Sequence, residues 1–105
     1  MAKYLYLASY TSEGLKGLLK DGGSRRRKDL GDAVKEMNGT LETLYFAFGQ
    51  NDVYSIVDLP DNVSAATIAL KISASGAAKV TTVVLLTPEQ IDEATKISVS
   101  YRPPG

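Results

Sequence analysis

The chain has 105 residues, the size of one domain, with 12 basic and 12 acidic side chains and neither histidine nor cysteine. The balanced charge creates no field that would draw it to nucleic acid or to a membrane. Without histidine and cysteine, the chain lacks the usual ligands of zinc and copper, and it cannot form disulfides or a Ser-His-Asp triad. No apolar run spans a bilayer and no signal peptide is recognisable. We expect a cytoplasmic protein without metal or cofactor.

The first half of the chain predicts a strand and two helices. Residues 3–10 are rich in aromatic residues and leucine, which favours a strand. Thr11 or Ser12 is placed to cap a short helix that Gly22-Gly23 ends. Ser24 is predicted to cap a second helix, which stops at Asn38-Gly39 because asparagine and glycine tolerate the left-handed conformation.

The second half predicts two strands, a helix, another strand and a closing helix. The strands cover residues 41–48 and 53–59, and Asp61 is placed to cap a helix over residues 63–75. A β-branched strand over 79–86 follows. The segment Thr87-Pro88-Glu89-Gln90 is typical of a helix start with a capping box. We expect the last five residues to be extended.

The predicted order is therefore β-α-β-β-α-β with a short C-terminal helix. Right-handed crossovers place both main helices on one face of a four-stranded antiparallel sheet. The predicted fold class is α+β and ferredoxin-like, in a single domain over residues 1–105.

Alternation along the strands predicts two different faces. A turn at Gln50-Asn51 would pair Phe48 with Val53 and separate aliphatic from tyrosine-bearing positions. We expect the helices to cover the aliphatic face, which includes Leu5 and Leu7. The other face then stays uncovered, and an apolar face of this kind indicates an interface or a ligand site. Its predicted members are Tyr4, Tyr6, Ala8, Tyr45, Ala47, Tyr54 and Ile56.

The segment VSAATIALKISASGAA points the same way, because Lys71 is its only charge and a surface helix normally has a polar stripe. We therefore expect this helix, like the uncovered face, to be buried by another subunit. The prediction is a homodimer, in which the helix can join dimers into a larger assembly.

Several segments resemble, in order, the GYD family of small bacterial proteins: EGLKGLLKDGGSRRRK, YFAFGQNDVYSIVDLPDNVSAA, SASGA, LLTPEQIDEATK and the terminal YRPPG. The Gly-x-Tyr-Asp signature of the family falls on residues 49–52, where Gly49 and Asp52 match and Asn51 replaces the tyrosine. The resemblance implies a dimeric α/β barrel, with two ferredoxin-like sheets packed face to face. It implies no particular activity, because the family is generally described as of unknown function.

Six residues are candidates for ligand binding: Tyr4, Tyr6, Tyr45, Tyr54, Asp52 and Asp58. The tyrosines can line a pocket or pack at a dimer interface. Asp52 can lean over the open face or stabilise a turn over residues 49–52, in which Asn51 is predicted to adopt positive φ. Asp58 can serve a site, cap the following helix or lie in water at the rim. No catalytic residue and no metal ligand can be assigned.

The run Arg25-Arg26-Arg27-Lys28 lies at a predicted helix start, where free N–H groups attract anions. These cations oppose the helix dipole, however, and no aromatic residues are interleaved with them. We interpret the run as a solvated helix turn that pairs with Asp21 or Asp29 across subunits, and we expect no binding to nucleic acid.

Three functions remain open at this point. The first is a homodimer that binds a small, partly apolar ligand between sheet and partner. The second is a cofactor-independent or borrowed-cofactor enzyme, monooxygenase-like or isomerase-like, using Asp52 or Asp58 with tyrosine hydroxyls. The third is a structural or regulatory assembly module. A cavity with convergent polar groups favours the first two.

Overall fold

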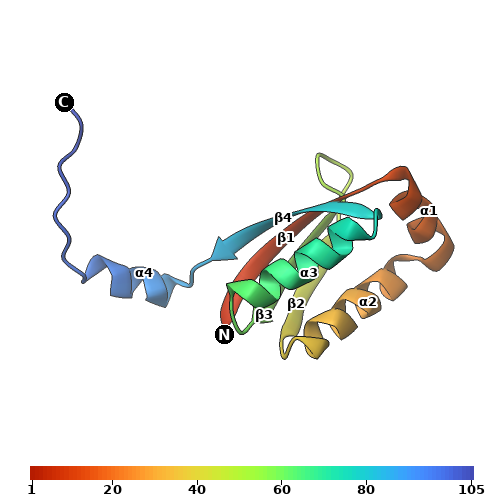
Figure 1. The fold of residues 1–105 in the computed structure, drawn as a ribbon, viewed down its shortest axis with the longest axis horizontal. Helices are drawn as coiled ribbons and strands as arrows, with labels where there is room; N and C mark the ends of the chain where they lie inside the picture. Colours follow the sequence, from red (N-terminus) through yellow and green to blue (C-terminus); the bar gives the residue numbers. More distant parts are fainter.

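The computed structural model describes residues 1–105 and confirms the α+β, ferredoxin-like prediction. Four strands form one antiparallel sheet in the order β2-β3-β1-β4, and helices α2 and α3 lie over one face of it (Figure 1). No helix has both the length and the apolar character needed to cross a membrane. The elements are β1 (Ala2–Tyr10), α1 (Ser12–Asp21), α2 (Gly23–Glu36), β2 (Thr40–Phe46), β3 (Val53–Leu59), α3 (Asn62–Ala74), β4 (Ala78–Leu85) and α4 (Pro88–Thr95).

Local sequence signals set most of the helix ends. Thr11 caps α1, Asp61 caps α3 through the Ser64 amide at 2.8 Å, and Thr87 forms the predicted capping box of α4. The predicted helix α2 is present, but the prediction of Ser24 as its N-cap is wrong, because the helix begins at Gly23 and Ser24 lies inside it. Its N-cap is Gly22, at φ 83°, which supplies no side-chain hydrogen bond.

The hydrophobic core lies between the sheet and the helices, and it corrects the predicted faces of β1. Tyr4 and Tyr6 were expected on the open face, but they are 1% and 2% exposed beneath the helices. β1 pairs Tyr4 with Val57 and Tyr6 with Ser55, so these side chains share the covered face of β3. The other core residues are Val34, Val57, Leu59, Ala65 and Ile68.

Helix α3 explains why tyrosines can occupy the core. The Tyr6 hydroxyl donates a hydrogen bond to the Ala65 carbonyl at 2.6 Å, and the Tyr4 hydroxyl donates to Asn62 Oδ1 at 2.6 Å. A buried phenol needs such a partner, and both acceptors lie at the start of α3.

The β2–β3 hairpin has a longer loop than predicted. Phe46, rather than Phe48, pairs with Val53, and the Ala47 amide donates to the Asp52 carbonyl at 2.9 Å. The observed strand register differs from the predicted one by two residues, so the side chains near the loop keep their predicted faces. The prediction of positive φ at Asn51 is wrong. Asn38, at φ 61°, is the one non-glycine residue with positive φ, and it forms the predicted left-handed stop after α2.

A C-terminal arm, residues 88–105, extends away from the body of the domain (Figure 1). It gives the molecule a radius of gyration of 16.5 Å, compared with about 13 Å for a compact chain of this length. Every residue of the arm is exposed. Its apolar side chains are Ile91, Ile97, Val99 and Tyr101.

Candidate functional site

The open face of the sheet, opposite α2 and α3, is apolar, as predicted, but its members differ. The strand register places Leu5 and Leu7 there in place of Tyr4 and Tyr6. Tyr45 and Tyr54 form a directly opposed pair and are 71% and 37% exposed. The register adds Thr43, Ile56, Thr81, Val83 and Leu85. No element of the chain covers this face.

Asp58 lies on the open face in an ion-pair cluster at one end of the sheet. Lys3, its direct partner in β1, contacts Asp58 Oδ1 at 3.0 Å and Glu42 Oε2 at 2.6 Å. Hydrogen bonds to Glu42 and then to Asp58 raise the pKa of Lys3. The sequence did not single out Lys3 or Glu42. Glu42 sits at a β-bulge between Leu41 and Thr43 that strand alternation cannot foresee.

Asp52 and Asn51 fasten the hairpin loop to β1. Asp52 Oδ2 accepts a hydrogen bond from the Tyr10 amide at 2.8 Å, and the Asp52 amide donates to the Ala8 carbonyl at 2.8 Å. Ser9 Oγ lies 3.2 Å from Asn51 Oδ1. The Asp52 carboxylate therefore binds the backbone of Tyr10 and holds the hairpin loop against the end of β1.

The six predicted candidates do not form one site. Tyr4 and Tyr6 lie in the core, whereas Tyr45 and Tyr54 lie on the opposite face of the sheet. Asp52 and Asp58 flank the two ends of β3, about 20 Å apart at the usual rise per strand residue. The arrangement gives no support to an enzyme that combines these carboxylates with tyrosine hydroxyls.

A cavity that the sequence did not predict lies on the other side of the sheet. This helix-side cleft has a volume of about 330 Å³, and 11 of its 16 lining residues are apolar. Its base comes from β1, β2 and β3, and its walls come from α2, α3 and β4. Small side chains leave the space unfilled, because proteins otherwise pack their interiors densely. The alanines that line it are Ala8, Ala33, Ala77 and Ala78.

Polar groups lie in the helix-side cleft, and one of them is buried without a hydrogen-bond partner. That group is Nε of Arg26, on the α2 wall. Ser55, on the base, is only 2% exposed. Tyr10 lines the same cleft, and burial raises the pKa of its phenol. Ser55 had a sequence signal: it occupies a buried position of β3 between Val53 and Val57.

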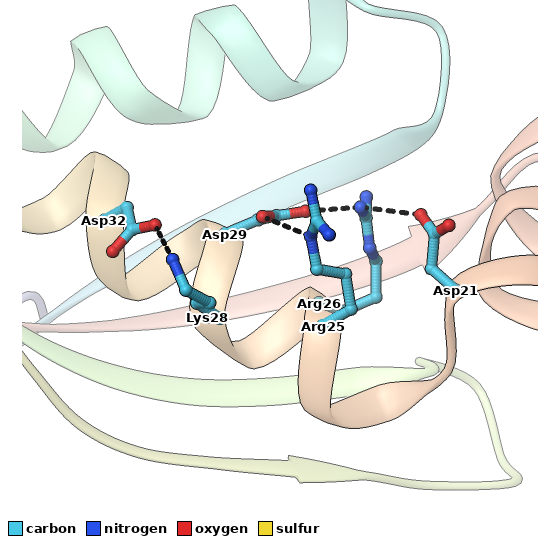
Figure 2. Close-up of polar contacts among 6 residues, drawn as sticks. All are labelled: Asp21, Arg25, Arg26, Lys28, Asp29 and Asp32. Carbon is cyan, nitrogen blue, oxygen red and sulfur yellow. Dashed lines mark hydrogen bonds and ion pairs between the residues drawn. The ribbon is translucent and has the colours of Figure 1, made fainter.

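The arginine run forms ion pairs within one chain, as Figure 2 shows. Arg26 Nη2 contacts Asp21 Oδ2 at 2.9 Å and also contacts Asp29, while Arg25 Nε contacts Asp29 Oδ1 at 3.1 Å. Lys28 pairs with Asp32 one turn further along α2. Asp21 and Asp29 are the predicted partners, but the prediction that they pair across subunits is wrong, because both lie in the same chain as the arginines. Because Arg26 and Asp29 also line the helix-side cleft, this network fixes one of its walls.

Comparison with known proteins agrees with the resemblance seen in the sequence. The family model described as GYD domain matches residues 4–95, which run from β1 to the end of α4. No curated protein and no solved structure matches the chain. Because the family match covers most of the chain and every strand and helix of the fold, the protein belongs to the GYD domain family.

Proposed function

We propose that this protein is a homodimer that binds a small, partly apolar ligand. The dimer forms across the open face of the sheet, and the ligand occupies the helix-side cleft of each subunit. This arrangement moves the ligand away from the sheet–partner interface, where the sequence placed it, and gives the two faces of the sheet separate roles.

The observation that carries the ligand proposal is the buried Nε of Arg26. A buried polar group without a hydrogen-bond partner costs stability, so such groups in native proteins generally meet a water molecule or a ligand. Arg26 Nε has no partner in the chain, and Arg26 lines an apolar cavity whose base includes Ser55. The volume of about 330 Å³ falls at the lower end of the range of small-molecule pockets.

The open face supports a second copy of the chain as the dimer partner. Its centre is apolar and aromatic, which is the composition of interface cores. Its charged residues balance, since Lys3 and Lys79 oppose Glu42 and Asp58. Two identical faces can therefore meet without net repulsion, and a two-fold interface requires such self-complementarity.

The C-terminal arm supports the same assembly. Ile97 and Val99 are 68% and 85% exposed, and the body of the same chain covers neither. The arm leaves from β4, an edge strand, and points away from the helices and the rest of the sheet (Figure 1). A second subunit is the surface that would cover these side chains.

The dimer is tested by placing charge at the centre of the open face. Leu7 and Tyr54 are directly paired there, so replacing both with lysine should prevent association while the helix-side core remains intact. Light scattering at micromolar concentration should find a monomer, and circular dichroism should show that it is folded. The control Val63→Lys, on an exposed position of α3, should remain dimeric. A monomeric wild type would contradict the proposal.

The ligand is tested by native mass spectrometry of the gently purified protein. The wild type should carry a bound small molecule, and Ala33→Leu should lose it because the larger side chain fills the cleft. Ala66→Leu, on an exposed position of α3 outside the cleft, is the matched control and should keep the ligand. An equal bound mass in the Ala33 variant, or none in the wild type, would exclude the helix-side cleft as the binding site.

A further inference from the structure

We propose that the ligand of the helix-side cleft is a small amphiphilic carboxylate, with an aliphatic or aromatic body and one anionic end. The inference rests on the proposed function, because it assigns a chemical class to the ligand of that same cavity. Three features carry it: the hydrogen-bond donors of the lining, with the buried and unpaired Arg26 Nε among them, the occupied acceptor and the apolar lining.

The polar groups that the lining offers to a ligand are hydrogen-bond donors. Arg26 Nε is buried without a partner and can only donate, and the exposed Lys71 Nζ can also only donate. The hydroxyl of Ser55, a residue that is 2% exposed at the base, can donate as well. A ligand that satisfies these groups must bring acceptor oxygens.

The one acidic residue of the lining is already engaged. Both carboxylate oxygens of Asp29 are used, Oδ1 by Arg25 and Oδ2 by Arg26 (Figure 2). Asp29 is therefore unavailable to a cationic ligand. Arg25 and Arg26 are balanced by Asp21 and Asp29, so the charge of the lining that no carboxylate pairs with is that of Lys71. This positive charge favours an anion.

The remainder of the lining selects an apolar body. Leu30, Leu44, Ile72 and Val80 contribute aliphatic surface, and Tyr6 contributes its ring. A fully polar anion such as inorganic phosphate would lose its hydration against these side chains without compensation. A carboxylate with a hydrocarbon body instead pairs its acid group with the donors and buries its body against the lining.

The test compares three probes with eight carbon atoms each, octanoate, octan-1-ol and octylamine, by isothermal titration calorimetry at neutral pH. Octanoate should bind most tightly and octylamine most weakly. Ser55→Ala should weaken octanoate about tenfold, because a hydrogen bond to a charged group is lost. The affinity is the deciding measurement, because a serine with only a structural role would lower the stability of the unliganded protein and leave the octanoate affinity unchanged.

Charge is tested separately at an exposed position. Lys71→Gln should weaken octanoate about threefold and leave octan-1-ol unchanged. The control is Lys20→Gln, because Lys20 lies in the last turn of α1 as Lys71 does in α3, and it does not line the cleft. Equal affinity for octanoate and octan-1-ol, or tightest binding of octylamine, would overturn the assignment of a carboxylate ligand, although the cleft would still be a binding site. Failure of all three probes to bind would refute the inference, whereas the proposed function would fall only if native mass spectrometry also found no ligand.

Discussion

Replacing Tyr6 with phenylalanine should destabilise the protein at neutral pH. The change removes the 2.6 Å hydrogen bond from the Tyr6 hydroxyl to the Ala65 carbonyl and leaves the ring in place. A buried hydrogen bond of this kind contributes about 1–1.5 kcal/mol to the free energy of unfolding. In a domain of this size, that loss lowers the melting temperature by about 4–12 °C.

The cost of the Tyr6→Phe substitution should disappear in alkali. Burial, with a smaller effect from the neighbouring Tyr4, raises the pKa of Tyr6 from 10.0 to about 12. Below pH 10 the phenol is neutral in both the folded and the unfolded chain, so its contribution is fully present. Above pH 10 the unfolded chain loses the proton first, and stability falls as pH rises. At about pH 11 the wild type has lost about 1.4 kcal/mol that the phenylalanine variant cannot lose.

Urea unfolding followed by circular dichroism would measure both effects. It should be run at one protein concentration, because association would contribute to stability. The wild type should exceed Tyr6→Phe in stability at neutral pH, and the two should be nearly equal at about pH 11. The control is Tyr101→Phe on the exposed arm, which should behave as the wild type at both pH values. A gap between wild type and Tyr6→Phe that stays the same at both pH values would refute the reasoning.

Two further substitutions test how the helices are fixed. Gly14→Ala would place a methyl group 1.9 Å from the Ala77 carbonyl oxygen, so thermal unfolding should show that the free energy of unfolding falls by about 3 kcal/mol or more. The control Gly17→Ala adds a methyl group in open space on the same helix and should raise the free energy of unfolding by up to about 1 kcal/mol. Asp61→Ala should lower the melting temperature at neutral pH, because the Asp61 carboxylate accepts from the Ser64 amide and hydroxyl, which lowers its pKa. The difference in melting temperature between wild type and Asp61→Ala should be complete above the ordinary pKa of 3.8 and vanish as the pH falls below it. A difference that persists in strong acid would contradict a cap that depends on the ionised carboxylate.

The fold could be predicted because it depends on local signals. Caps at Thr11, Asp61 and Thr87 lie within a turn of the helices that they begin. The faces of β1 could not be assigned in the same way. Alternation separated the leucines from the tyrosines correctly, but both sets can be buried. Acceptors on α3, nearly sixty residues away, decide in favour of Tyr4 and Tyr6.

The helix-side cleft illustrates a different limit of sequence-based prediction. It lies where α2, α3 and all four strands meet, so its shape depends on side chains from most of the chain. Periodicity finds the buried position of Ser55, but it cannot show that Nε of Arg26, which lines the same cleft, is buried without a partner. The open face was predictable in character because Tyr45, Tyr54 and Ile56 are adjacent in the hairpin, whereas the contribution of β1 depended on a long-range choice.

The two phenol contacts of β1 give α3 a fixed direction over the sheet. An alanine-rich helix has little relief on its surface, so packing alone would let it slide or swivel at small cost. Tyr4 holds Asn62 and Tyr6 holds Ala65, one helical turn further on. With a single contact the helix could still rotate about that point, whereas two contacts along the strand fix the direction of the helix axis. Because Lys71, Ile72 and Ser75 form one wall of the cleft from the far end of this helix, the orientation set at its first turn determines where that wall stands.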